Sequence, residues 1–161
     1  MSATETETNL TTKVVAVNRI LFASDFSCQS SVALPYVLAL ARHYEAKVFL
    51  AHVVPTESYV LVSPETGAER FEEATVQARL QLDELSGQFE GIPKEELLAQ
   101  GGITDALLDM IEEKRIDLVV VGTHGHRGLK RLVLGSVAEE VFRNSPCSVL
   151  TVGSHVSLGT H

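Results

Sequence analysis

Apolar runs and amphipathic segments alternate along most of this chain. Four runs carry apolar residues without polar alternation, which predicts strands covered on both faces: residues 18–24, 47–54, 117–122 and 147–152. Between these runs, apolar residues recur three and four positions apart, as they do on one face of a helix. The segments with this spacing are residues 30–46, 68–89, 103–115 and 136–144.

Two of the helical segments carry further local signals. The apolar stripe of residues 30–46 consists of Ala33, Val37, Leu40, Ala41 and Tyr44. Pro35 is compatible with that helix only in its first turn, because an interior proline costs about 3 kcal/mol. Ser136, followed three residues later by Glu139, is typical of a capping box and predicts that Ser136 caps the last helix.

A third strand completes the order of elements. Residues 92–101 are ambiguous by themselves, and their place in the alternation makes them a strand. Five strands alternating with helices predict an α/β fold, in which helices cover both faces of a mostly parallel sheet. The longest connection is residues 55–67. In such a sheet, ligands bind at the carboxyl ends of the strands.

Length and composition describe one domain of ordinary globular type. The chain has 161 residues, 45% of them hydrophobic and 21% charged. We expect a mobile tail at residues 1–17, one domain at residues 18–153 and a second tail at residues 154–161. The formal net charge of −8 argues against binding to nucleic acid or to an anionic membrane.

Signals for export, membrane insertion or disulfide bonding are absent from the sequence. The first 17 residues contain no apolar signal core, and no apolar run approaches the roughly 18 residues that span a membrane. The two cysteines, Cys28 and Cys147, form no CxxC pair, which favours free thiols in a reducing compartment. We therefore expect a cytoplasmic location.

Two strand ends carry residues suited to a ligand. The first predicted strand ends in Ser24 and Asp25, and the fourth leads into a segment with Gly122, Gly125 and Gly128. Glycines at such an exit let the backbone approach a ligand and turn its amides toward it. Asp25 could also do no more than cap the following helix.

Features that favour an anion follow the glycines. Gly135 and Ser136 begin the next helix, whose unpaired amides and dipole attract negative charge. Arg127, Lys130 and Arg131 add positive charge in an otherwise acidic chain. Together these features indicate a cradle for a polyphosphate. Each of them alone is equally compatible with a turn, a helix cap or a solvated face.

The spacing Gly122-x2-Gly125-x9-Gly135-Ser136 resembles the G-2x-G-9x-G-(S/T) motif of the ATP-binding branch of the universal stress protein family. The resemblance covers residues 18–152 and includes "RILFASDFS" and "AKVFLAHVV". It implies a Rossmann-like adenine-nucleotide-binding fold, with a five-stranded parallel sheet in the order 3-2-1-4-5. It also implies a homodimer that forms through the edge strand at residues 147–152, which leaves unpaired backbone groups.

The resemblance implies a role for each matching position. Asp25, with Ala23 and Ser24, would face the adenosine, and Val53 would border the adenine. Magnesium would be held mainly by the phosphates. Backbone groups around the ribose and phosphates would come from the glycine segment and the helix start: Gly122, Thr123, His124, Gly125, Gly135, Ser136 and Val137.

The chain lacks the motifs of competing nucleotide folds. No GK(S/T) occurs, which excludes a Walker A loop, and the dinucleotide fingerprint GxGxxG is not matched. His52, at a strand end, is interpreted as a core histidine with satisfied hydrogen bonds. His124 and His126 could contact phosphate or transfer a proton.

The favoured function is an ATP-binding, nucleotide-sensing regulatory module in the stress response, read by an unknown protein partner. The alternative is a slow ATPase, or a phosphotransferase that phosphorylates itself at Ser136 or Thr123. Efficient phosphoryl transfer needs a positioned base, and the sequence supplies no convincing one beside the γ-phosphate. A scaffold that binds no nucleotide is disfavoured, because Gly122, Gly125 and Gly135 are all present.

Overall fold

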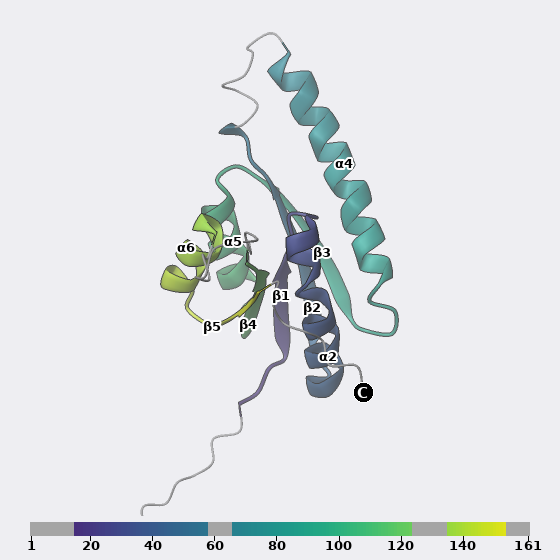
Figure 1. The fold of residues 1–161 in the computed structure, drawn as a ribbon, viewed down its shortest axis with the longest axis vertical. Helices are drawn as coiled ribbons and strands as arrows, with labels where there is room; N and C mark the ends of the chain where they lie inside the picture. The colour runs from purple at the N-terminus through teal and green to yellow at the C-terminus, as the bar shows by residue number, and fades with distance from the viewer. Residues whose placement is uncertain (1–14, 58–65, 124–134, 154–161) are drawn as a thin grey trace, which may run out of the picture.

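A fully parallel five-stranded sheet in the order β3-β2-β1-β4-β5 forms the centre of the molecule (Figure 1). The computed structural model describes residues 15–57, 66–123 and 135–153. The strands are β1 (Arg19–Ala23), β2 (Lys47–Val54), β3 (Lys94–Gln100), β4 (Leu118–Gly122) and β5 (Ser148–Val152). The predicted α/β class and strand order are therefore confirmed, including the ambiguous third strand.

Helices cover both faces of this sheet (Figure 1). The α2 and α4 helices pack on one face, and the α5 and α6 helices pack on the other. The short α1 helix follows β1 at the carboxyl edge of the sheet. The helices are α1 (Cys28–Ser31), α2 (Leu34–Tyr44), α4 (Gly67–Gly87), α5 (Ile103–Glu113) and α6 (Ser136–Asn144).

Side chains of the central strands alternate between two hydrophobic cores. In β1, Ile20 and Phe22 belong to the core under α2 and α4, and Leu21 belongs to the core under α5 and α6. All three are buried. Because both faces are covered, the strand needs apolar residues at successive positions, which explains its continuous apolar run.

The single helix predicted over residues 30–46 is two helices in the structure. Ser27 caps α1, and the chain turns before α2 begins at Leu34. Pro35 is the second residue of α2, so its predicted place in the first turn is confirmed. Tyr44 does not join the buried stripe: it is 38% exposed at the last position of α2, where its ring packs edge-on against His43.

Parts of the predicted tails and of the longest predicted connection are not among the described residues. Residues 1–14 and 154–161, where tails are predicted, and residues 58–65 of the predicted loop lie outside the described residues. Val17, which the prediction places in the tail, is buried against the α2–α4 core instead. In the described part of the chain, no helix is long and apolar enough to cross a membrane.

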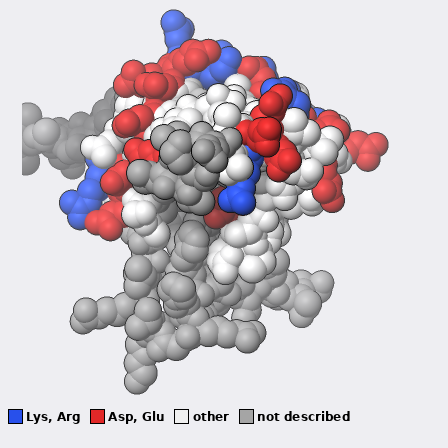
Figure 2. Space-filling view, turned by 90° about the horizontal axis from the view of Figure 1, so that it is seen from above, with Lys and Arg blue, Asp and Glu red and all other residues white. Residues whose placement is uncertain are grey.

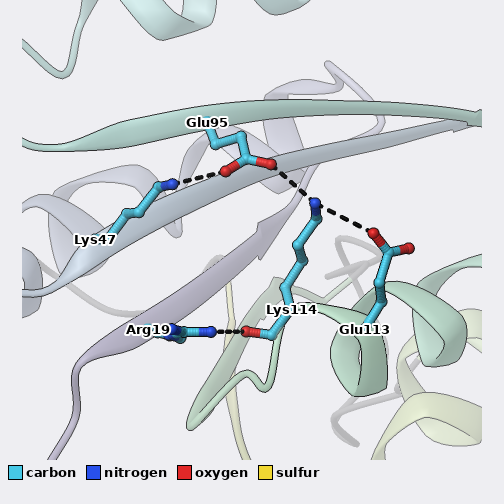
Figure 3. Close-up of polar contacts among 5 residues, drawn as sticks. All are labelled: Arg19, Lys47, Glu95, Glu113 and Lys114. Atoms are coloured by element: carbon cyan, nitrogen blue, oxygen red, sulfur yellow. Dashed lines mark hydrogen bonds and ion pairs between the residues drawn. The ribbon is translucent and has the colours of Figure 1, made fainter.

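An ion-pair network joins the amino ends of β2 and β3 to the end of α5 (Figure 3). The Glu95 carboxylate lies 2.6 Å from Nζ of Lys47 and 3.0 Å from Nζ of Lys114. Lys114 also pairs with Glu113 at 3.2 Å, and its backbone carbonyl accepts a hydrogen bond from Arg19. The network lies at the amino edge of the sheet. Ligands of open parallel sheets bind at the other edge, where the strands end.

Candidate functional site

A cavity of about 400 Å³ opens at the carboxyl ends of β1, β2 and β4. Its volume falls within the roughly 300–1,000 Å³ typical of small-molecule sites. It lies where the strand order reverses between β1 and β4, the usual ligand position in open parallel sheets. Its lining residues are Ala23, Ser24, Asp25, Ser27, Gln29, Ser30, Ala51, His52, Val53, Ile103, Leu107, Val121, Gly122, Gly135, Ser136, Val137 and Ala138.

One wall of the cavity is apolar. Val53 of β2 and Val121 of β4 are buried, and both belong to the core under α5 and α6. Ile103 and Leu107 reach the same wall from the first turns of α5. This wall suits the flat, weakly polar face of an aromatic base, because burying such a face removes apolar surface from water.

Another part of the cavity rim is the turn between β1 and α1, which carries the predicted Asp25. Its Oδ1 atom accepts hydrogen bonds from the backbone amide of Ser27 at 3.0 Å and from its hydroxyl at 2.5 Å. Ser27, not Asp25, is the N-cap of α1, because its side chain accepts from the amide of Ser30. Asp25 is exposed at the rim. The alternative left open by the sequence, that Asp25 caps the following helix, is therefore wrong.

The start of α6 forms a third side of the cavity. Gly135 is the N-cap, and no side chain caps the first turn. The predicted capping box is therefore wrong: Ser136 is the first helical residue, and Glu139 pairs with Arg143 at 2.8 Å. Amides in the first turn of a helix have no partner within the helix, so they can donate to an anion.

Gly122 is a glycine because α1 packs against it. A Cβ atom there would lie 2.6 Å from the carbonyl oxygen of Gln29 and 2.8 Å from the Cα atom of Ser30. The close approach that the structure shows at Gly122 is to α1, and the expected approach to a ligand stays a prediction. Gly122 still lines the cavity, at the end of β4.

Most of the described positions predicted from sequence gather around this cavity. They are Ala23, Ser24, Asp25, Val53, Gly122, Gly135, Ser136 and Val137. Thr123 is not in the lining: it is buried, and its amide and hydroxyl both donate to the carbonyl oxygen of Val152. The remaining predicted positions, His124, Gly125, Arg127, Lys130 and Arg131, lie outside the described residues, as does His126.

Sequence reasoning missed several lining residues. Ile103 and Leu107 follow an ordinary helical stripe, which gives no sign that the end of the stripe faces a cavity. Ser27 and Ser30 follow Asp25 closely, and their polar type after a strand end is the one signal that could have found them. His52 has a satisfied hydrogen bond, as predicted, but it also lines the cavity.

The fold and the cavity define an α/β domain with a cavity at the switch point of a parallel sheet. The model described as the Universal stress protein family matches residues 16–153, and the chain belongs to that family. The universal stress protein YxiE of Bacillus subtilis is 31% identical over 145 residues, which cover 84% of this chain and 98% of YxiE.

Solved structures show the same architecture. The structure of MJ0577, from Methanocaldococcus jannaschii, has a TM-score of 0.76 and 28% identity, and the match covers 89% of this chain and all of MJ0577. A universal stress protein solved in complex with cAMP has a TM-score of 0.58 and 25% identity. That match covers 86% of this chain and 98% of the cAMP-bound protein.

Proposed function

We propose that this protein binds ATP in the cavity at the carboxyl edge and acts as a nucleotide-sensing regulatory module in the stress response. The supporting observation is that one cavity combines an apolar wall, the carboxylate of Asp25 and the uncapped start of α6. These three parts match a base, a ribose and a phosphate chain in their chemistry. The family relative in complex with cAMP, itself an adenine nucleotide, supports the same class of ligand.

In this proposal each side of the cavity holds one part of the nucleotide. Val53 borders the adenine, and Asp25, beside Ala23 and Ser24, accepts hydrogen bonds from the ribose or the base. The start of α6, at Gly135, Ser136 and Val137, donates backbone amides to the phosphates. Gly122, at the end of β4, lines the cavity beside the place that we assign to the ribose.

Negative charge must be neutralised for a polyphosphate to bind. Looking down on the molecule, acidic side chains are spread over the described surface with fewer basic ones between them (Figure 2). Arg127, Lys130 and Arg131 are the cations we assign to the phosphates. Within residues 15–57, 66–123 and 135–153, no cluster of His, Cys, Asp or Glu could hold a metal ion. In this proposal magnesium arrives with the phosphates and offsets their charge.

The lining of the cavity favours binding over rapid turnover. Among its described residues, Asp25 and His52 are the ionisable ones. Asp25 accepts from Ser27, and His52 is bonded to Ser24, so both side chains are engaged in holding the turn. Phosphoryl transfer needs a base aimed at the attacking group. Slow hydrolysis, or phosphorylation of Ser136, is the alternative outcome.

Calorimetric titration with ATP and magnesium tests the proposal. We expect the unmodified protein to bind, with ADP appearing slowly if at all. Asp25→Ala should weaken binding about tenfold or more, because it removes a charged hydrogen-bond acceptor. Ser27→Ala should weaken binding less, because it removes a turn hydrogen bond and keeps the carboxylate.

The control is Asp83→Ala, which removes an exposed carboxylate from α4 outside the cavity lining. Its affinity should equal that of the unmodified protein. Absence of binding at every workable concentration, or equal affinity of Asp25→Ala and the unmodified protein, would contradict the proposed site. Rapid release of ADP would move the assignment to the ATPase alternative.

We infer too that two copies of the chain pair through β5, so that nucleotide occupancy can be read by a dimer and by a regulatory partner. Both β3 and β5 are edge strands. The β3 sequence KEELLAQ carries charges, whereas the β5 sequence SVLTV carries none. Charged residues protect an edge from pairing, so β5 is the edge that favours association.

A further inference from the structure

The turn at the rim of the cavity, residues 24–27, is joined to β2 at two points: the backbone amide of Ser24 donates to the carbonyl oxygen of Ala51 at 3.0 Å, and the side chain of His52 contacts the turn. The Nδ1 atom of His52 lies 2.7 Å from the carbonyl oxygen of Ser24. The same imidazole stacks on the ring of Phe26, with centroids 4.3 Å apart and planes inclined by 28°. His52 therefore contacts the residue before Asp25 and the residue after it.

The hydrogen bond defines the tautomer of His52. A carbonyl oxygen accepts and cannot donate, so Nδ1 must carry the proton in this contact. In the neutral ring, Nε2 is then the nitrogen without a proton. This assignment can be measured directly, with or without a ligand.

The backbone of the turn is strained at Phe26. Its φ of 61° lies in the left-handed region, which a bulky aromatic residue rarely adopts. Such a conformation persists only where its surroundings hold it in place. The amide of Phe26 donates to Oγ of Ser24 at 3.1 Å, and the ring is held by His52. Phe26 lies between Asp25 and Ser27, whose amide and hydroxyl both donate to the Asp25 carboxylate, so the conformation of Phe26 places these donors relative to Asp25.

The turn also has space into which it could relax. A second cavity of about 190 Å³ lies between the turn and the last part of α4, where Phe26 and Leu85 line it. Ser24, Ser27 and Ser30 line both cavities, so the turn is the partition between them. His52 lines the larger cavity and Phe26 the smaller one, so their stacked rings lie across this partition.

We propose that His52 is a positioning residue of the nucleotide site, which holds Ser24 and Phe26 so that Asp25 faces the cavity before a ligand arrives. The proposal rests on the proposed function for its ligand. Its physical basis is preorganisation: a rim that is already in the binding conformation loses less freedom when the nucleotide binds.

Two substitutions separate the hydrogen bond from the ring stack. His52→Phe keeps an aromatic ring against Phe26 and removes the donor to Ser24, whereas His52→Asn keeps a side-chain N–H donor and removes the ring. We expect His52→Phe to weaken ATP binding about fivefold to tenfold, the size of one lost hydrogen bond. His52→Asn should recover part of that loss. His43→Phe, at an exposed position of α2, is the matched control and should leave affinity unchanged.

Two further readouts report the turn itself, and the comparison of affinity with unfolding stability separates positioning from a purely structural role. In the nucleotide-free protein, nitrogen NMR should show His52 with its proton on Nδ1, and His52→Phe should speed hydrogen exchange of the Phe26 and Ser27 amides. A ring with its proton on Nε2 and none on Nδ1 would overturn the proposal, and so would a His52→Phe variant with lower unfolding stability but unchanged affinity. If the unmodified protein binds no nucleotide, the proposed function fails. Amide exchange then decides the positioning role: faster exchange in His52→Phe supports it, and unchanged exchange overturns it.

Discussion

At the scale of single residues, Gly122 belongs to the glycine motif expected to bind a nucleotide, and the packing of the fold also requires a glycine there. The backbone of α1 occupies the place of its missing side chain. We expect Gly122→Ala to destabilise the protein by about 1–3 kcal/mol, because neither the strand nor α1 can accept the extra methyl group without moving. ATP binding should weaken as well, since α1 and the rim turn move together. Urea unfolding and calorimetry measure the two effects.

Gly87→Ala is the matched control for this substitution. Gly87 is the last residue of α4, and nothing lies within 4 Å of the place of its Cβ atom. Alanine there should stabilise the protein by roughly 0.5 kcal/mol, because glycine is a poor helix former. If Gly122→Ala is as stable as the unmodified protein, the close packing against α1 is wrong.

Part of the cavity lining could be predicted from the sequence. The lining residues and contacts that were not predicted have a physical reason in common. The glycine motif and Asp25 mark strand ends, which a parallel sheet brings to one edge, so their meeting follows from topology. The packing of α1 on Gly122 joins segments far apart in the sequence, which no local pattern reports. Ile103 and Leu107 have the spacing of core residues, and only the three-dimensional structure shows that they end at a cavity.

At the scale of elements, the end of α2 is strained at one exposed residue. Glu45 has φ 51° and ψ 37°, the left-handed conformation that usually takes glycine after a helix. Glu45→Gly should raise the free energy of unfolding by about 1 kcal/mol, because glycine adopts this conformation without steric cost. Arg42→Gly, at an exposed position inside the same helix, should lower it by about 1 kcal/mol. Chemical unfolding measures both free energies. If the two substitutions changed the free energy of unfolding in the same direction, this account would be contradicted.

The ion-pair network at the amino edge makes stability depend on pH (Figure 3). Hydrogen bonds from Lys47 and then Lys114 lower the pKa of Glu95, and the bond to Glu95 raises the pKa of Lys114. A lowered pKa in the folded state stabilises the protein above the ordinary value of the carboxyl, and this contribution is lost as pH falls through the lowered value. The contribution of Lys114 runs the other way and is lost as pH rises through its raised value.

Glu95→Gln tests this dependence. Its stability deficit relative to the unmodified protein should be constant near neutral pH and should shrink as pH falls below the ordinary carboxyl pKa of 4.5 and through the lowered pKa of Glu95. It should also shrink in about 1 M salt, because these side chains are partly exposed and screened. Glu96→Gln, an exposed neighbour outside this network, is the control and should change stability little. A deficit that grows in acid would contradict the sign of the pKa shift.

Most elements were predictable because their patterns are local. The continuous apolar runs of β1, β2 and β4 arise from burial on both faces, and a strand of this kind can be recognised without tertiary knowledge. The start of α6 was misassigned by one residue, because Ser136 with Glu139 has the capping-box spacing while Gly135 takes the cap. The break between α1 and α2 was missed because Ser27 caps a helix of a single turn, too short to show a period.

At the scale of the whole molecule, the two edges of the sheet differ in a way that decides how copies of the chain could associate. Val149 of β5 and Leu97 of β3 are both half-buried, and both pack against the core under α5 and α6. They therefore form a matched pair on opposite edges. A lysine at either position disturbs its own edge in the same way and leaves the other edge intact.

We expect the unmodified protein to sediment as a dimer, Val149→Lys as a monomer and Leu97→Lys as a dimer, over a concentration series. The charge at β5 would repel its copy and would have to be desolvated on pairing, whereas the charges that β3 already carries disfavour pairing at that edge. Circular dichroism should show that both variants keep their helices and strands. Dissociation by Leu97→Lys alone, or a monomeric unmodified protein at every concentration, would exclude β5 as the contact between copies.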